Sequence, residues 1–425
     1  MQENKAWSRL DNAAKIFPPT SSRRDTKVFR FLCELTESVE PVPLQHALER
    51  TITQFPFFRS TLKKGMFWYY LEDTGALPQV AEEHEAPCAP LYDGEKPGPL
   101  FRVLYYGRRI NLELHHALAD GSGALQFLRT LVFSYLSERH GIKGTLSDDA
   151  SPGERELDAF YKYYDRTQAV PKAVRYRACH IRGEHLPDYH TGVTEGILPA
   201  SAMLAQAHTF DATLSEFLVA QLICAVRDGM AVREHLRPVV VSVPVDLRRF
   251  FPAQTARNFF GLIHVAYHVR KEKDSFEQVL AAVRADFARQ LTRENLEGVI
   301  GRYAAIENHP LIKSVPLQLK IPSLKLAGWW AGGGDTVALS NLGRVTMPTE
   351  AAPYIRLFDV VLSTGRPQIC LCSFGDTLAV SVSSPLADTG LQRRFFQSLT
   401  ALGLPMQVVS DIDDVREGGR DYAAL

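Results

Sequence analysis

The stretch His115-His116-Ala-Leu-Ala-Asp120-Gly121 decides how this chain is interpreted. It lies where an alternating apolar run, Leu100 to Leu114, passes into a segment with leucines at helical spacing. Neighbouring side chains of a strand point to opposite faces, so only one of the two histidines can face a cleft. Because the pKa of histidine lies nearest neutrality, a histidine at a strand end is a candidate general base.

We assign His116 as the candidate base and His115 as its structural support. Asp120 follows His116 by four residues, and its carboxylate could orient His116 or brace the loop through a cation. Gly121 permits close backbone approach and could offer its N–H to a developing oxyanion. The alternative is a pair of core histidines followed by an aspartate that caps a helix.

Length and composition narrow the class of protein. The 425 residues exceed what one hydrophobic core usually holds, so we expect two lobes that share a cleft. Lysine plus arginine and aspartate plus glutamate both number 48, which favours neither nucleic acid nor an anionic membrane as partner. No apolar run is long enough to span a bilayer and no cleavable signal opens the sequence, so we expect a cytoplasmic protein. The six cysteines have no disulfide or zinc spacing, so we expect reduced thiols and no metal site.

Segments with strand and helix periodicity alternate in both halves, which predicts an α+β fold. In the first half we expect a strand within 24–37, a helix within 43–54, strands turning at Lys64-Gly65, a hairpin turning at Gly107-Arg108, and a helix with Ser122 as N-cap. In the second half we expect helices at 213–228, 275–291, 295–308 and 389–402, and strands at 238–245, 259–270, 336–340, 356–363, 368–374 and 378–384. The stretch through Pro316 and Pro322 is expected to lead only to a Gly-rich turn.

The pattern H-H-x-x-x-D-G after a strand resembles the signature of the CoA-dependent acyltransferase superfamily. That superfamily includes chloramphenicol acetyltransferase, alcohol acetyltransferases and nonribosomal peptide condensation domains. Two later segments carry the resemblance further. Residues 243–249 (VPVDLRR), followed by 258–261 (NFFG), look like the element of the second lobe in which an arginine pairs with the motif aspartate. Residues 340–343 (SNLG) are similar to the S-N-x-G strand end of alcohol acetyltransferase-like members.

The resemblance implies two chloramphenicol-acetyltransferase-like lobes, residues 1–165 and 166–425, each a mixed β-sheet with flanking helices. An active-site tunnel is expected between them. His116 is then the base that deprotonates the acceptor for direct attack on an acyl thioester, without a covalent acyl-enzyme. Asp120 becomes a brace paired with Arg248. Ser340 or Asn341 could donate to the oxyanion, or could simply be turn-forming residues at a strand end.

The implied partners are small molecules. The donor is expected to be acyl-CoA, used as a co-substrate with no permanently bound cofactor, and the acceptor a hydroxyl or an amine. One alternative is a free-standing condensation-type enzyme that forms amides and takes its donor from an acyl carrier protein. Another is a non-catalytic binding member of the same fold. The D-F-G-W-G motif of the plant acyltransferases is absent, since the nearest segment, 373–376 (SFGD), lacks the Trp.

Overall fold

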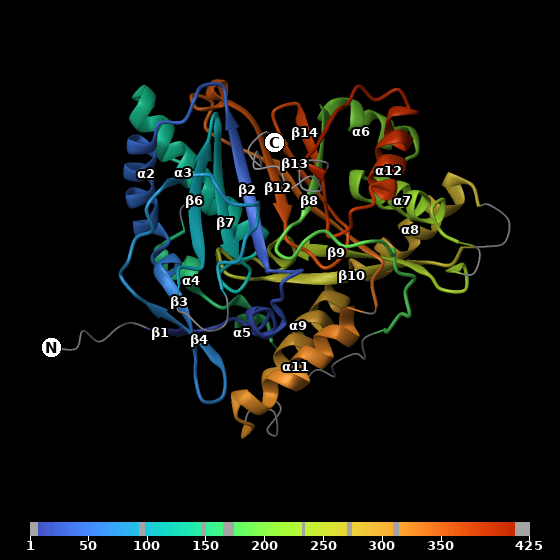
Figure 1. Cartoon of the computed structure of the whole chain (residues 1–425), viewed down its shortest axis with the longest axis horizontal. Helices are drawn as coiled ribbons and strands as arrows, with labels where there is room; N and C mark the ends of the chain where they lie inside the picture. Colours follow the sequence, from blue (N-terminus) through green and yellow to red (C-terminus); the bar gives the residue numbers. More distant parts are fainter. Residues whose placement is uncertain are drawn as a thin grey trace.

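The computed structural model of the chain describes residues 7–92, 98–146, 150–164, 174–231, 234–269, 274–308, 314–332 and 334–412. Within these ranges the strands form two large mixed sheets and a small one, and helices pack against both large sheets (Figure 1). The predicted α+β architecture of two lobes is therefore confirmed. The boundary predicted between residues 165 and 166 lies outside the described residues and stays a prediction.

The first sheet positions His116, the candidate base, which directly follows one of its strands. Its order, among the described strands, is β12-β2-β7-β6-β5. The strands are β2 (Val28–Leu35), β5 (Ala81–Glu82), β6 (Phe101–Tyr106), β7 (Arg109–His115) and β12 (Ile355–Leu362). β6 and β7 form the expected hairpin, which turns where Gly107 takes a φ of 53°. On one face, Phe31, Leu112 and Leu114 pack into a core with α2 (Pro41–Gln54) and α3 (Gly121–His140).

The opposite face of the first sheet is polar although it is buried. Alternate residues of β7 point to this face, among them Glu113 and His115, both fully buried. Glu113 accepts hydrogen bonds from Arg30 Nε at 2.8 Å and from Arg102 Nε at 2.7 Å. Because Glu113 is paired with two arginines, its carboxylate can be buried without the cost of an unpaired charge.

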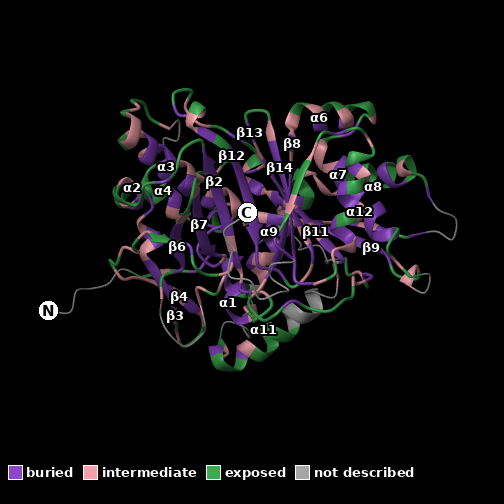
Figure 2. Ribbon diagram, turned by 45° about the horizontal axis from the view of Figure 1, so that its top comes forward, coloured by how far each residue is buried: buried purple, intermediate pink, exposed green. Residues whose placement is uncertain are grey.

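The second sheet belongs mostly to the C-terminal half, and its described strands follow the order β10-β9-β11-β13-β14-β8-β15. They are β8 (Gly192–Pro199), β9 (Val239–Asp246), β10 (Phe260–Tyr267), β11 (Val337–Val345), β13 (Gln368–Phe374), β14 (Thr377–Ser384) and β15 (Gln407–Ser410). Helices α6 (Ala200–Thr209), α7 (Leu214–Arg227), α8 (Phe276–Gln290) and α12 (Gly390–Thr400) lie with it. Figure 2 shows the inner strands of both large sheets as the buried centre of the molecule, whereas the edge strands β5 and β15 are exposed.

One strand connects the lobes. β12 comes from the C-terminal half, yet it pairs antiparallel with β2 in the first sheet, with Phe358 opposite Cys33. The chain then returns through β13 to the second sheet. The two lobes are therefore linked by an exchanged strand as well as by side chains.

The remaining elements lie around this framework. They are β1 (Trp7–Arg9), β3 (Ser60–Lys64) and β4 (Tyr69–Asp73), which form the small sheet; the short turns η1 (Ala14–Ile16), η2 (Pro56–Arg59), η4 (Leu247–Arg249) and η5 (Ala352–Tyr354); and the helices α1 (Phe17–Thr20), α4 (Pro152–Glu156), α5 (Ala159–Tyr163), α9 (Arg293–Asn308) and α11 (Leu317–Gly332).

Several local expectations were wrong. The stretch through Pro316 and Pro322 forms the helix α11, which was not predicted and which accommodates Pro322 in its interior. β8, α6 and β15 were also missed. The N-cap of α3 is Asp120 rather than Ser122, since the Asp120 carboxylate accepts from Gly123 N at 2.9 Å. All six cysteines fall within the described ranges, and each is a buried free thiol, as expected.

No single helix of the described residues is long and apolar enough to cross a membrane. α6 and α7 reach the required length and composition only as a pair bent by 79°. All but the first residues of α7 are buried in the core of the second lobe.

Candidate active site

His116 is the first residue beyond β7, and its position is fixed by the backbone and by aromatic rings. Its N–H donates to Lys27 O at 2.8 Å. Its imidazole stacks on Phe17 with ring centroids 3.8 Å apart, and Phe29 lies 4.1 Å away on a tilted plane. Phe260, which opens β10 of the second sheet, lies 5.4 Å away. The ring is therefore held at the junction of the two lobes among aromatic side chains.

Asn258 fixes the tautomer of His116. The Asn258 amide nitrogen donates to Asp11 Oδ2 at 3.0 Å and to His116 O at 3.1 Å, so its Oδ1 is oriented as an acceptor. This oxygen lies 2.9 Å from His116 Nδ1, which must therefore carry the proton. The consequence is that Nε2 keeps a lone pair. Burial lowers the pKa of His116 to about 3, although the bond to Asn258 opposes this, so the ring is neutral at neutral pH.

His115 has the opposite tautomer and serves a different contact. Its Nδ1 accepts from Ala117 N at 3.1 Å, so its Nε2 carries the proton and donates to Ser21 Oγ at 3.1 Å. Ser21 Oγ in turn donates to Phe17 O at 3.0 Å. His115 thus holds the short segment whose Phe17 ring stacks on His116.

The Asp120 carboxylate is bound at a junction with the second lobe and not to the His116 ring. Arg248 donates to the Asp120 carboxylate from both terminal nitrogens, Nη1 to Oδ2 at 2.9 Å and Nη2 to Oδ1 at 3.2 Å. The Asp120 carboxylate also accepts from Phe259 N at 2.7 Å and caps α3. Arg248 donates further to Thr255 O at 3.0 Å and to Arg257 O at 2.6 Å. Since both side chains are largely buried, the pair joins α3 to the 255–259 segment.

Two glycines allow this close approach. A Cβ on Gly121 would lie 2.8 Å from Leu342 Cδ2, so the Leu342 side chain of β11 packs against the start of α3. A Cβ on Gly123 would lie 1.8 Å from the carbonyl oxygen of Ala256, which is not sterically possible. The first turn of α3 can therefore meet the backbone of the second lobe only because Gly123 has no side chain.

Asn341 and Ser340 lie on β11 just before Leu342. The Asn341 side chain is already engaged, since its Nδ2 donates to Ser215 Oγ at 3.0 Å and its Oδ1 accepts from Gly343 N at 2.8 Å. Gly343 has a φ of 78°, and the strand register shifts at this point. Ser340 is half-buried. These contacts give Asn341 a part in shaping the bulge.

The structure brings the motif of 115–121, Arg248 and Leu342 to one place, and it adds residues that the motif does not contain. The sequence predicts no role for Asn258 beyond its place in the N-F-F-G segment. Asp11 and Phe17 had no local signal at all, because they meet His116 only through the fold. Gly123 could have been suspected from its position in the first turn of a helix, where a glycine is unfavourable without a packing reason.

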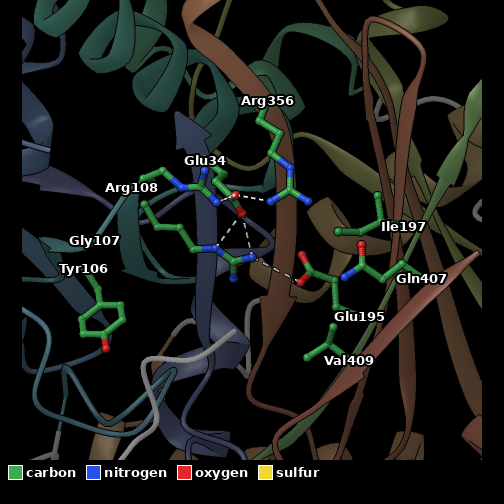
Figure 3. A pocket seen from close by; sticks show the side chains of 10 residues that line it. Glu34, Tyr106, Gly107, Arg108, Glu195, Ile197, Arg356, Gln407 and Val409 are labelled. Carbon is green, nitrogen blue, oxygen red and sulfur yellow. Dashed lines mark hydrogen bonds and ion pairs between the residues drawn. The ribbon is translucent and has the colours of Figure 1, made fainter. Parts of the chain in front are cut away.

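A second polar cluster lies around Arg109, at the end of β7 opposite to His116 (Figure 3). Arg109 of β7 donates to Glu34 of β2 at 2.9 Å and to Glu195 of β8 at 3.4 Å, and so spans the two large sheets. Arg108 and Arg356 also bind Glu34. Burial favours the neutral carboxyl, but Arg109 and Arg356 outweigh it and hold the pKa of Glu34 below 4.5. These side chains line a pocket of about 270 Å³ between the lobes.

No family model and no curated protein matches the chain. Solved structures match over nearly its whole length. TRI3 trichothecene 15-O-acetyltransferase from Fusarium sporotrichioides has a TM-score of 0.63 at 12% identity, covering 93% of this chain and 94% of its own. TRI101 from F. sporotrichioides, complexed with coenzyme A and T-2, has a TM-score of 0.63 at 12% identity and coverages of 94% and 99%. The first condensation domain of the calcium-dependent antibiotic synthetase, bound to a substrate analogue, has a TM-score of 0.61 at 17% identity and coverages of 92% and 95%.

The fold therefore places the chain with proteins of the two-lobed architecture that these acetyltransferases and condensation domains share. The chain has the fold of these acetyltransferases and condensation domains. At such low identity the likeness concerns the fold, and the chemistry has to be argued from the residues of the site.

Proposed function

We propose that this protein is an acyltransferase that moves an acyl group from acyl-CoA to a hydroxyl or amine acceptor, with His116 as general base. The observation that carries the proposal is the His116–Asn258 hydrogen bond, which leaves a neutral ring with its lone pair on Nε2. A general base needs this form of the ring at the start of the reaction.

The chemistry balances without a covalent acyl-enzyme. His116 Nε2 takes the proton of the acceptor as the acceptor heteroatom bonds to the thioester carbonyl carbon. Collapse of the tetrahedral intermediate breaks the carbon–sulfur bond, and the proton on Nε2 passes to the departing sulfur. Because the ring is surrounded by Phe17, Phe29 and Phe260, the imidazolium is unfavourable and returns its proton readily. The N–H of Gly121 and the Ser340-Asn341 pair remain candidates for the oxyanion.

The other motif residues are proposed as positioning residues. Asp120 and Arg248 hold the start of α3 against the second lobe. His115 holds Phe17 in place through Ser21. This division of labour differs from a triad, since the Asp120 carboxylate is committed to Arg248, Phe259 and Gly123.

The structural neighbours support acyl-CoA as the donor, because TRI101 of the same fold was solved with coenzyme A. The condensation domain is about as similar in fold as TRI101, so a carrier-protein thioester is the second class of donor to be tested. Assays of one acceptor panel with acyl-CoA and with acyl-carrier protein distinguish these donors. We expect turnover with acyl-CoA, and exclusive use of the carrier-protein donor would favour the condensation-type enzyme.

The test of the proposed base is His116→Ala, with His115→Ala beside it. Removal of a general base is expected to lower kcat by roughly 10² to 10⁴ while the circular dichroism spectrum stays unchanged. His115→Ala should lower activity less and should also lower the melting temperature, since it removes two hydrogen bonds from a fully buried site. Near-normal turnover of folded His116→Ala would refute the assignment.

A further inference from the structure

One surface of the molecule is apolar and basic but exposed. It consists of residues 63–68, at the tip of the β3–β4 hairpin, and residues 317–326 of α11. We refer to it as the hairpin–α11 surface. Figure 1 shows both parts protruding together below the small sheet, and residues 317–326 of α11 are mostly exposed, as the green of the described part of this helix in Figure 2 shows. Its most exposed apolar side chains are Met66 at 74%, Leu319 at 69%, Leu326 at 55% and Phe67 at 41%.

The two parts are joined by hydrogen bonds and by a cation–π contact. Leu317 N donates to Met66 O at 2.8 Å, and Lys320 Nζ donates to Phe67 O at 2.9 Å. The Lys320 ammonium also lies 3.8 Å from the centroid of the Trp68 ring. The exposed apolar side chains are therefore held outward by contacts beneath them.

The charged residues of this surface are all basic. Its segments, KKGMFW and LQLKIPSLKL, contain four lysines and no acidic residue. Lys63 pairs with Glu72 of β4 at 3.6 Å, and Lys320 is held against the hairpin, while Lys64 and Lys325 are exposed. Exposed apolar side chains with a basic fringe are the composition of helices and loops that bind an anionic membrane surface. The neutral net charge of the whole chain does not reveal this patch.

We propose that the hairpin–α11 surface docks on an anionic phospholipid bilayer, with Met66, Phe67 and Leu319 entering the interface. A second copy of this chain fits the surface less well. A two-fold contact would bring the same lysines of both copies together with no acidic residue to receive them. A protruding tip also suits insertion into a bilayer better than it suits a groove-binding peptide. The inference does not depend on the acyl-transfer chemistry.

Vesicle flotation of the full chain tests the proposal. We expect the protein to float with vesicles of phosphatidylcholine plus phosphatidylglycerol, and to float less with phosphatidylcholine alone or at raised salt. Phe67→Ser and Leu319→Ser should each weaken binding by about tenfold. Lys64→Gln and Lys325→Gln should each weaken binding to the anionic vesicles by about fivefold and leave binding to neutral vesicles unchanged.

The matched control is Leu236→Ser, because Leu236 is 88% exposed and lies just before β9, outside this surface. It should bind vesicles like the wild-type chain, and thermal melts should show that every variant is folded. Failure of the wild-type chain to float with anionic vesicles would overturn the proposal. So would equal binding by the Phe67→Ser, Leu319→Ser double variant. A concentration-dependent dimer that Leu319→Ser dissociates, without vesicle binding, would assign the surface to a second copy instead.

Discussion

The proton on His116 is placed by Asn258, a residue 142 positions further along the chain. The Asn258 amide has one orientation, because its nitrogen donates to Asp11 and to His116 O and its oxygen therefore faces His116 Nδ1. A single amide side chain therefore decides which imidazole nitrogen is basic. Asn258 is a positioning residue, since it acts through His116.

Asn258→Ala is expected to lower kcat by roughly tenfold to a hundredfold with little change in KM, because the base is present but no longer held in one tautomer and orientation. Nitrogen NMR of labelled histidine gives the decisive reading. His116 should show the Nδ1–H tautomer in the wild-type chain and a mixture in the variant. An unchanged tautomer together with unchanged kcat would remove Asn258 from the mechanism.

Acidification should destabilise the protein through its neutral buried histidines. Burial lowers the pKa of His115 to about 3, whereas an unfolded chain binds that proton near pH 6.5. The stability contributed by this lowered pKa is fully present above pH 6.5 and is lost as the pH falls toward 3. The free energy of unfolding should fall by up to about 1.4 kcal/mol per pH unit for this group.

Urea unfolding of His115→Asn, followed from pH 6.5 down to about pH 5, isolates this contribution before most carboxylates titrate. Asparagine keeps an acceptor for the Ala117 N–H but takes up no proton. We expect a flatter dependence on pH than in the wild-type chain. Parallel curves for the two proteins would mean that His115 does not titrate between the folded and unfolded states.

At the level of secondary structure, α3 is placed by its first turn. Its N-cap carboxylate is shared between the helix and Arg248, and its third residue touches the backbone of the opposite lobe. The helix start, the ion pair and the contact of Leu342 with Gly121 therefore lie together at one junction. This junction positions the turn that carries His116.

Gly123→Ala should force α3 away from the 255–257 backbone, because the new methyl group would overlap the Ala256 carbonyl. We expect a loss of about 3 kcal/mol or more in the free energy of unfolding, measured by denaturant titration. Gly153→Ala in α4 is the matched control, since nothing lies within 4 Å of the added Cβ. The control should be neutral or slightly stabilising. Equal stability of the two variants would contradict the close approach of α3.

Three interactions connect the two lobes: the pairing of β12 with the first sheet, the Asp120–Arg248 ion pair, and the charged cluster around Arg109. Arg109 is the residue of the cluster that contacts both large sheets. Glu34 and Glu195 each have only 4% of their side chain exposed. Removing Arg109 takes from the buried Glu195 its ion pair with that cation, whereas Glu34 keeps Arg108 and Arg356.

Arg109→Met is therefore expected to cost about 3 kcal/mol in the free energy of unfolding. Arg108→Met is the comparison, since Arg108 binds the same Glu34 with 51% of its side chain exposed, and it should cost less than about 1 kcal/mol. Denaturant titration of both variants at neutral pH measures the difference. Similar small effects would show that the cluster does not stabilise the contact between the lobes.

Local patterns were sufficient for much of the fold. The helices α8 and α12 follow from periodicity, because each buries one regular face. The hairpin of β6 and β7, the helix α7 and the strands β13 and β14 were also predicted from local sequence, although α7, β7, β13 and β14 are buried on nearly every side. α11 could not be found in this way, since it is apolar without a clear face and contains Pro322. The exchange of β12 between lobes was equally invisible, because pairing partners far apart in the chain leave no local signal.

By itself, the sequence determined that a histidine stands at the end of a strand, with an aspartate and a glycine spaced to begin a helix. Only the tertiary structure decided what these residues touch. It directed Asp120 to Arg248 instead of His116, gave adjacent histidines opposite tautomers, and supplied Asn258 and Phe17 from distant segments. The physical reason is that periodicity records which face of an element is buried, whereas a hydrogen bond depends on positions fixed to within a few tenths of an ångström by the packing of both lobes.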